Sequence, residues 1–428
     1  MSDYYGKAAG CIAATAGTGC HDGLFSDRKP RGLGPIKVEA KWSPDLMPKS
    51  LPPPGTYWLS FQWIRYKDAV HDAPLNRRAW VAQERFLSSR IMHFSRDTLF
   101  WECLEHLANE ASPDGLPFTD EYSVQLQEAR FKLAIRNLLE GISNIKMAGE
   151  RGSTATTSPR MDSKSFRVLW YRFRDTYSRC AITNDGDYLV ALSGIAQYIG
   201  KAMNDQFVAG LWRNNLIESL CWRAPLPDNP TLPTCSFRPT VWRAPTWSWA
   251  SLTLPLNTPQ LDTTAGQRSD THKAEVLDCF VDTKPSGQVV RASLTLRCRL
   301  IPIVVHSYNY TCGRGGLGFE TYLDGFEGAS SAISINLDDP MVSMAGSDSC
   351  SAWIVILRDA VESAGESCLE GLVIVHCADL VDKFERIGMF EHRAFHDHVL
   401  VDGTPKKWVY VELRKQHEEA EEQTIQLL

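Results

Sequence analysis

The chain has 428 residues, of which 43% are hydrophobic and 22% are charged, and its formal net charge is −6 at pH 7. This length predicts more than one domain, and the apolar fraction is sufficient for sizeable cores. The mild acidity, without any long basic run, argues against nucleic acid or an anionic membrane as the main partner. No stretch approaches 18 consecutive apolar residues, so the sequence predicts no membrane span.

The twelve cysteines stand singly, without a CxxC pair or a recurring spacing. A secreted chain of this length would be expected to carry paired spacings, whereas scattered thiols are typical of a reducing compartment. The N-terminal residues also lack the basic and apolar segments of a signal peptide. We therefore expect a cytoplasmic protein.

The first predicted segment, residues 1–110, mixes helix and strand signals. The end of a helix stops at Gly10, and residues 11–16 read as a short strand. After a turn-rich stretch, residues 74–87 predict a helix. Two alternating runs at 91–94 and 98–103 then predict a hairpin.

The middle of the chain is predicted to be helical. Residues 111–163 read as a helix over 121–148 followed by a flexible linker. In the next segment, residues 164–260, aromatic residues recur at helical spacing from Phe166 to Tyr177, and further helices are predicted at 188–202 and 208–222. This segment ends in a predicted strand at 247–251, with Trp247 and Trp249 on one face.

The last third has a β texture. Residues 273–415 are predicted to form a β-rich domain with strands at 289–298, 351–357, 371–376 and 408–412. Residues 416–428 read as an acidic, solvated tail. The predicted fold class is therefore mixed α+β.

Three sequence strings, in the right order, resemble a known family. Arg78-Ala-Trp-Val-Ala-Gln-Glu-Arg-Phe-Leu-Ser-Ser-Arg90, followed by Ile-Met-His-Phe and Leu-Phe-Trp-Glu-Cys103, resembles the closing helix and hairpin of the fungal heterokaryon-incompatibility (HET) domain. Tyr5-Gly-Lys-Ala-Ala with Ile12-Ala-Ala-Thr-Ala is similar to the segment before it. Arg243-Ala-Pro-Thr-Trp-Ser-Trp-Ala-Ser251 looks like an extension that follows the domain in many such proteins.

The resemblance implies an intracellular self/non-self recognition and cell-death protein that works with protein partners, other HET or incompatibility proteins among them, and that can form oligomers. It also implies a TIR-like α/β unit, a fold whose members can cleave NAD. The Trp-Gly and Cys-Ile-Asn-Gln strings that normally open the domain do not occur here. We therefore expect a HET unit that lacks its first strands and binds no cofactor. NAD is a possible substrate only if the incomplete unit retains catalytic activity.

Glu84 is the catalytic candidate. With Trp80, Gln83 and Leu87 it is expected to share one helical face, and a buried carboxylate there needs a charge partner, for which Arg77 is the candidate. In the catalytic interpretation, Glu84 polarises a ribose hydroxyl or stabilises positive charge during N-glycosidic cleavage. The alternative is an Arg–Glu–Gln network that locks the helix to the hairpin.

Other residues of the motif are interpreted as structural. His93 should point away from the side of the strand that carries its two neighbours, where a hydrogen-bonded core histidine is the alternative to a base. Glu102, beside Trp101, carries the same ambiguity. The structural candidates are Arg78, Trp80, Gln83, Arg90, His93, Trp101, Glu102, Trp247 and Trp249.

Two further patterns carry little chemistry. His392, His396 and His398, with Asp397, lie close together, but they match no recognised ligand spacing, and no metal site is expected. The glycine-rich run at 313–318 lacks the Lys-Ser/Thr of a P-loop, so a hairpin loop is expected.

Three functions follow from these observations. The first is an incompatibility-type signalling protein with an N-terminal effector and a C-terminal sensor. The second is a TIR-like NAD glycohydrolase that uses Glu84. The third is a catalytically dead regulatory remnant that pairs with intact HET domains.

Overall fold

The computed structural model describes residues 2–27, 36–41, 53–59, 65–116, 132–133, 135–137, 163–224, 237–253, 256, 269–310, 316–323, 335–339, 349–361, 367–377, 380, 382–394, 400–401, 404–405 and 407–428. It contains both helices and strands, so the mixed α and β fold is confirmed. The chain divides into two compact units, residues 1–162 and 163–428. Each unit is described by itself. Among the described residues, no helix combines the length and apolar character needed to cross a lipid bilayer.

Unit 1 is built on a four-stranded sheet with the order β1-β4-β5-β6. Its strands are β1 (Cys11–Ala13), β4 (Arg90–Phe94), β5 (Leu99–Cys103) and β6 (Leu107–Asn109). Strand β1 runs parallel to β4, whereas β4, β5 and β6 are antiparallel. The predicted strand after Gly10 and the predicted hairpin are therefore confirmed.

The helices of unit 1 are short. Helix α1 spans Ser2–Lys7, and α2 spans Ala79–Leu87. The predicted helix over 74–87 is correct only in its second part, because residues 75–77 form a separate 3-10 turn and Arg78 is extended. A π-helix at Lys67–His71 and a separate two-stranded pair, β2 (Ile36–Ala40) and β3 (Gly55–Leu59), complete the described elements.

Residues 132–133 and 135–137 are helical, and they are all that is described of the helix predicted over 121–148. The linker predicted over 149–163 lies outside the described residues, apart from its last residue.

Unit 2 begins with two predicted helices that are confirmed. Helix α4 spans Ser163–Ser178, and α5 spans Val190–Met203. The aromatic stripe of α4 is buried from Phe166 to Tyr177, with Trp170 edge-on to Trp212 at 5.2 Å between ring centroids.

The helix predicted over 208–222 is wrong. Strands β7 (Phe207–Val208) and β8 (Leu211–Trp212) form a two-stranded hairpin there, followed by a 3-10 turn and the short helix α6 (Leu216–Ser219). The chain reverses at Ala209 and Gly210, both of which have positive φ, at 46° and 99°. Alanine rarely adopts this conformation, so Gly210 was the one local sign of a turn, and the helical spacing of the apolar residues favoured a helix instead.

The predicted strand at 247–251 is also wrong. Residues Trp249–Ser251 form a 3-10 turn, and Ser248 caps it by accepting a hydrogen bond from the Ala250 amide at 3.1 Å. Trp247 and Trp249 are both fully buried, although they do not share the face of a strand.

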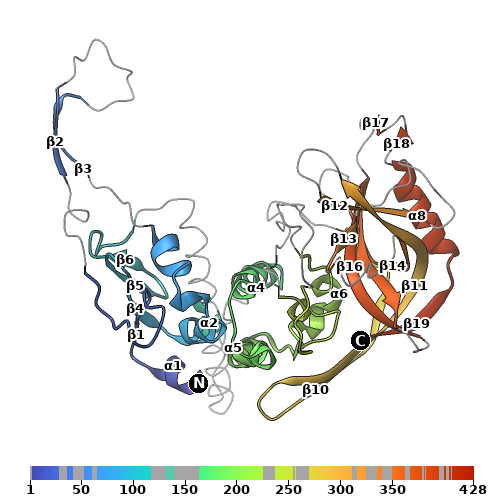
Figure 1. The fold of residues 1–428 in the computed structure, drawn as a ribbon, viewed down its shortest axis with the longest axis horizontal. Coiled ribbons are helices and arrows are strands. Elements are labelled where there is room, and N and C mark those ends of the chain that lie inside the picture. The colour runs from blue at the N-terminus through green and yellow to red at the C-terminus, as the bar shows by residue number, and fades with distance from the viewer. Residues whose placement is uncertain are drawn as a thin grey trace, which may run out of the picture. The chain divides into compact units, whose positions relative to one another are not determined.

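The C-terminal part of unit 2 is a nine-stranded sheet in which five strands close on themselves (Figure 1). The closed set is β11 (Val289–Tyr310), β14 (Ser349–Val361), β15 (Ser367–His376), β16 (Lys383–Ala394) and β19 (Glu422–Leu427). Closure occurs because β11 is long enough to pair with β19 through one half and with β14 through the other.

The remaining strands attach to this closed sheet or form small separate pairs. They are β9 (Ser269–His272), β10 (Glu275–Thr283), β12 (Gly316–Leu323), β13 (Ile335–Leu337), β17 (Leu400–Val401) and β18 (Thr404–Pro405). The glycine-rich run predicted as a hairpin loop ends in β12, and residues 311–315 lie outside the described residues. The strands predicted at 289–298, 351–357 and 371–376 are confirmed within β11, β14 and β15.

Two predictions near the C-terminus are wrong. The strand predicted at 408–412 lies in helix α8 (Lys407–Glu419), which flanks the closed sheet (Figure 1). Its Tyr410 and Leu413, three residues apart, are buried in the sheet's core, so tertiary packing overrides the strand preference of the local sequence. The predicted acidic tail is instead the end of α8 followed by β19, whose Ile425 and Leu427 are fully buried, although its acidic residues from Glu418 to Glu422 are exposed.

A buried arginine joins the helices of unit 2 to the closed sheet. Arg386 of β16 pairs with Asp338 at 2.8 Å and donates to the carbonyls of Leu220 and Trp222. Its guanidinium carbon also lies 3.4 Å from the centre of the Trp222 ring. Neither member of the ion pair is exposed, so the helical part and the sheet share one interior.

Candidate functional site

The hairpin of unit 1 directs two ionisable side chains into the interior. Its register pairs Ile91 with Glu102 and His93 with Phe100, so these four side chains share one face of the sheet. All four are buried, and His93 points away from the face of its neighbours, as predicted. Ionisable groups in such a position need specific partners.

Four donors bind the carboxylate of Glu102. The Tyr66 hydroxyl, Arg85 Nε and His93 Nε2 lie 2.6, 2.8 and 3.1 Å from Oε2. Lys132 Nζ donates to Oε1 at 2.7 Å. Protein groups therefore bind both oxygens of a carboxylate that is 4% exposed.

The donors also contact one another. Arg85 Nη2 donates to the Tyr66 hydroxyl at 3.1 Å, and Lys132 Nζ donates to the Arg85 carbonyl at 2.9 Å. The Thr15 hydroxyl lies 3.0 Å from His93 Nδ1. We call this set the Glu102 cluster; its members are Thr15, Tyr66, Arg85, His93, Glu102 and Lys132.

Electrostatics fixes the protonation states in the cluster. Burial disfavours the Glu102 anion, yet Arg85 and Lys132 hold the pKa of its carboxyl well below its usual value. Burial lowers the pKa of His93 more than the neighbouring Glu102 carboxylate raises it, so His93 is neutral at pH 7. Because an ionised carboxylate only accepts, His93 Nε2 carries the proton and Nδ1 accepts from Thr15.

This arrangement is suited to structure rather than turnover. A general acid or base needs a pKa near the working pH and reach to a substrate. Glu102 has a pKa far below that range and is buried among its donors. The cluster instead joins the hairpin to α2 through Arg85, and the carboxylate serves as the common acceptor.

Glu84 occupies a different place. It is half-buried on α2 near Tyr5, with which it shares a hydrogen bond, and near Cys11. Burial and then the charge of Glu84 raise the pKa of Tyr5 to about 12. The predicted partner, Arg77, is exposed, and among the described residues no ion pair joins it to Glu84.

The predicted lock between helix and hairpin therefore exists with other members. Gln83 is buried, but its Oε1 has no hydrogen-bond partner among the described residues. The ion pair that was expected between Arg77 and Glu84 is formed instead by Arg85, one position after Glu84, and Glu102. Successive helical positions differ by about 100°, which is why adjacent residues of one motif reach different surroundings.

The other motif residues of unit 1 lie at the surface or partly within it. Arg78 is exposed and precedes α2, and Arg90 is exposed and reaches the Ala9 carbonyl at 3.4 Å. Trp80 and Trp101 are partly buried. The structure does not bring these four residues into the Glu102 cluster.

The tryptophans of the Arg243–Ser251 string are core residues, as predicted. Trp249 Nε1 donates to the Gly210 carbonyl at 2.7 Å, and Ser248 Oγ donates to the Ala209 carbonyl at 2.5 Å. The Trp247 carbonyl accepts from Trp222 Nε1 at 2.9 Å. The string therefore holds the tight turn between β7 and β8.

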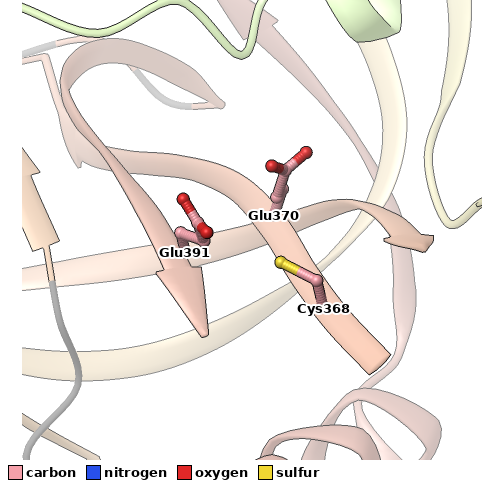
Figure 2. Close-up of side chains that lie close together, drawn as sticks. All are labelled: Cys368, Glu370 and Glu391. Carbon is pink, nitrogen blue, oxygen red and sulfur yellow. The ribbon is translucent and has the colours of Figure 1, made fainter. Parts of the chain in front are cut away.

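Three potential metal ligands meet in unit 2, namely Cys368, Glu370 and Glu391 (Figure 2). Their ligand atoms lie within 4.8 Å of one another, since Glu370 and Glu391 face each other across β15 and β16. Two arginines already neutralise the carboxylates, because Arg358 pairs with Glu370 and Arg223 pairs with Glu391. The charge balance of this group therefore does not favour a divalent cation.

The histidine group considered as a metal site is described only at His392, which is buried on β16. His396, Asp397 and His398 lie outside the described residues.

Sequence reasoning identified two members of the Glu102 cluster and missed the rest. The strand alternation that directs His93 inward also directs Glu102 inward, because the register places both side chains on one face of the sheet. Tyr66 and Lys132 lie 36 and 30 residues from Glu102 along the chain, and no local sequence pattern marks either of them.

No family model, no curated protein and no solved structure matches this chain.

Proposed function

We propose that the chain is a signalling and interaction protein of the fungal heterokaryon-incompatibility type, acting in the cytoplasm through protein contacts rather than turnover. The proposal starts from the resemblance of residues 78–103 to the closing motif of the HET domain. In this proposal the HET-like unit 1 is the effector, and the β-rich C-terminal part of unit 2 is a sensor or regulatory module.

One observation carries the proposal: the hairpin of the motif buries His93 and Glu102 on one face and presents apolar side chains on the other. On the face opposite the Glu102 cluster, the register aligns Ile12, Met92 and Trp101 across three adjacent strands. Ile12 is 65% exposed and Met92 is 36% exposed, and Trp101 is partly buried. An exposed apolar row on a folded sheet is typical of a protein contact surface.

The geometry gives less support to an NAD glycohydrolase. The described neighbours of Glu84 are a phenol and a thiol whose pKa values are raised, and neither is suited to act as an acid or base near pH 7. The Glu102 carboxylate is held by its four donors. The glycohydrolase hypothesis therefore depends on Glu84 alone as its catalytic group.

The test combines growth and turnover. Expression of the chain in a fungal host is expected to arrest growth, and the double substitution I12D/M92D is expected to abolish the arrest, because two charges on the outer row prevent apolar contact. Glu84→Gln is the matched control, and it should leave the arrest intact.

The same proteins, purified and incubated with NAD, separate the alternatives. Nicotinamide release that Glu84→Gln abolishes would replace the proposal with the glycohydrolase. Absence of both growth arrest and release would favour the regulatory remnant, whose expected property is pairing with an intact HET protein.

A further inference from the structure

Unit 2 contains a cleft between α5 and the hairpin that joins β10 to β11. Its volume is about 790 Å³, within the range of small-molecule sites. Figure 1 shows the hairpin extending from the closed sheet, and its tip lies against α5, where a Cβ on Gly287 would be 3.6 Å from Ser193 Cβ.

The floor of the cleft is apolar. Leu189, Ala196 and Val289 are buried there, and Phe207 and Val281 are partly exposed beside them. Such a floor favours an aliphatic or aromatic group over water.

The rim is cationic. Lys201 and Arg213 line the cleft, and among the described residues neither has a carboxylate partner. Within the part of the chain that the structure describes, the acceptors of Arg213 Nη1 are both neutral: the Gln206 side chain at 3.4 Å and the Cys279 carbonyl at 3.3 Å. An anionic group is therefore the natural partner for this rim.

One carboxylate, Asp205, also lies among the described lining residues, and it is already engaged. Its Oδ1 accepts from the backbone amides of Gln206 and Asn214 at 2.7 and 3.1 Å. These bonds fix the loop that carries the rim, and they leave the formal charge of the described lining at one positive unit.

The wall at Ala209 is held in a sparsely populated conformation. Ala209 has a φ of 46°, and side chains of Ser248 and Trp249 bind the carbonyls of Ala209 and Gly210. A non-glycine residue in this region persists only where its surroundings over-determine it, and such positions cluster at ligand sites.

We propose that this cleft binds a small amphipathic anion, with its carboxylate, sulfonate or phosphate group at Lys201 and Arg213 and its apolar body on the floor beside Phe207. The site is separate from the Glu102 cluster and does not depend on the proposed signalling function.

The probe is 8-anilinonaphthalene-1-sulfonate, an aromatic sulfonate whose fluorescence rises in an apolar site. The full chain is expected to bind one equivalent. The double substitution K201E/R213E should weaken binding at least about tenfold, because it replaces both cationic contacts to the sulfonate by negative charges. Lys284→Glu, on the same hairpin but outside the lining, should leave binding unchanged.

A neutral substitution tests the floor separately. Ser193→Phe places a ring in the cleft and should abolish binding of the sulfonate, and decanoate should compete with the probe on the unsubstituted chain. Circular dichroism confirms that each variant is folded. Binding that survives both K201E/R213E and Ser193→Phe, or no binding by the folded full chain at millimolar probe, would overturn the proposal.

Discussion

Glu102 is the residue at which the hairpin, α2 and the segment before α2 converge. Its carboxylate binds groups from Tyr66, Arg85, His93 and Lys132, which lie on different segments of unit 1. A buried ion pair adds little net stability compared with an apolar substitute, but it is costly to break from one side. The residue therefore specifies how these segments meet.

Replacing Glu102 with glutamine removes the negative charge but keeps the shape. We expect a loss of about 3–5 kcal/mol in the free energy of unfolding, because Arg85 and Lys132 lose their common carboxylate in a buried place. Urea unfolding measures the loss. Glu84→Gln, also a helix-to-hairpin candidate but half-buried, should cost less than about 1 kcal/mol, and equal losses would contradict the role of the cluster.

The lowered pKa of His93 predicts a pH dependence. Below its ordinary value of 6.5 the unfolded chain takes up a proton that the folded chain does not, so stability falls as the pH falls. Below 4.5, Glu102 adds a loss of the same sign, because its own pKa is lowered in the folded state.

Unfolding in urea at about pH 7 and about pH 5.5 measures this slope. The substitution His93→Gln should make it shallower. Some slope should persist, because burial also lowers the pKa of His417 in unit 2. An unchanged slope in His93→Gln would mean that His93 titrates alike in both states.

At the scale of elements, predictions from local pattern succeeded where the pattern is long and periodic. The aromatic stripe of α4 is such a pattern, and the almost continuous apolar runs of β14 and β15 were equally clear as buried strands. The predictions failed where distant packing decides: Tyr410 lies in a run of β-branched and aromatic residues that favours a strand, but Tyr410 and Leu413 pack into the closed sheet from a helix. The acidic residues before β19 similarly favoured a solvated tail, and the strand signal of the alternating Ile425 and Leu427 was missed.

The end of α5 offers a test of local conformation. Asn204 follows the helix in the left-handed region, with φ of 52° and ψ of 49°, and it is exposed. Asn204→Val should destabilise unit 2 by about 1–2 kcal/mol, because a β-branched residue is disfavoured there. Asn204→Gly should be neutral or slightly stabilising, and thermal unfolding distinguishes the two.

Strand β19 carries its own prediction. Leu427 is fully buried where β19 pairs with β11, so Leu427→Ala should cost about 2–5 kcal/mol. Gln423→Ala, on the same strand but exposed, is the matched control and should be close to neutral. Similar losses in both variants would show that β19 contributes pairing but no core.

At the scale of the whole molecule, the two compact units differ in how they are held together. Unit 2 joins helices to a closed sheet through the Arg386–Asp338 pair, with Asp339 accepting from the Phe237 and Arg238 amides at 2.9 and 3.2 Å. Charged groups at this junction are hydrogen-bonded on both sides, which couples the two layers energetically.

We therefore expect residues 163–428, expressed alone, to fold and to unfold in a single transition. Coincident midpoints from tryptophan fluorescence, which reports mainly on tryptophans outside the closed sheet such as Trp170, Trp212 and Trp222, and from far-UV circular dichroism would support this expectation. Separate transitions would show that the junction does not couple the layers.

The closure of the sheet by β19 has a consequence for synthesis in the cell. Leu294 of β11 pairs with Leu427, so the sheet cannot close until residue 427 has left the ribosome. Until then β11 and β16 each present an unpaired edge, and such edges recruit other chains. A nascent chain is thus vulnerable to aggregation during translation of its last third, and premature termination before Glu422 would make that exposure permanent.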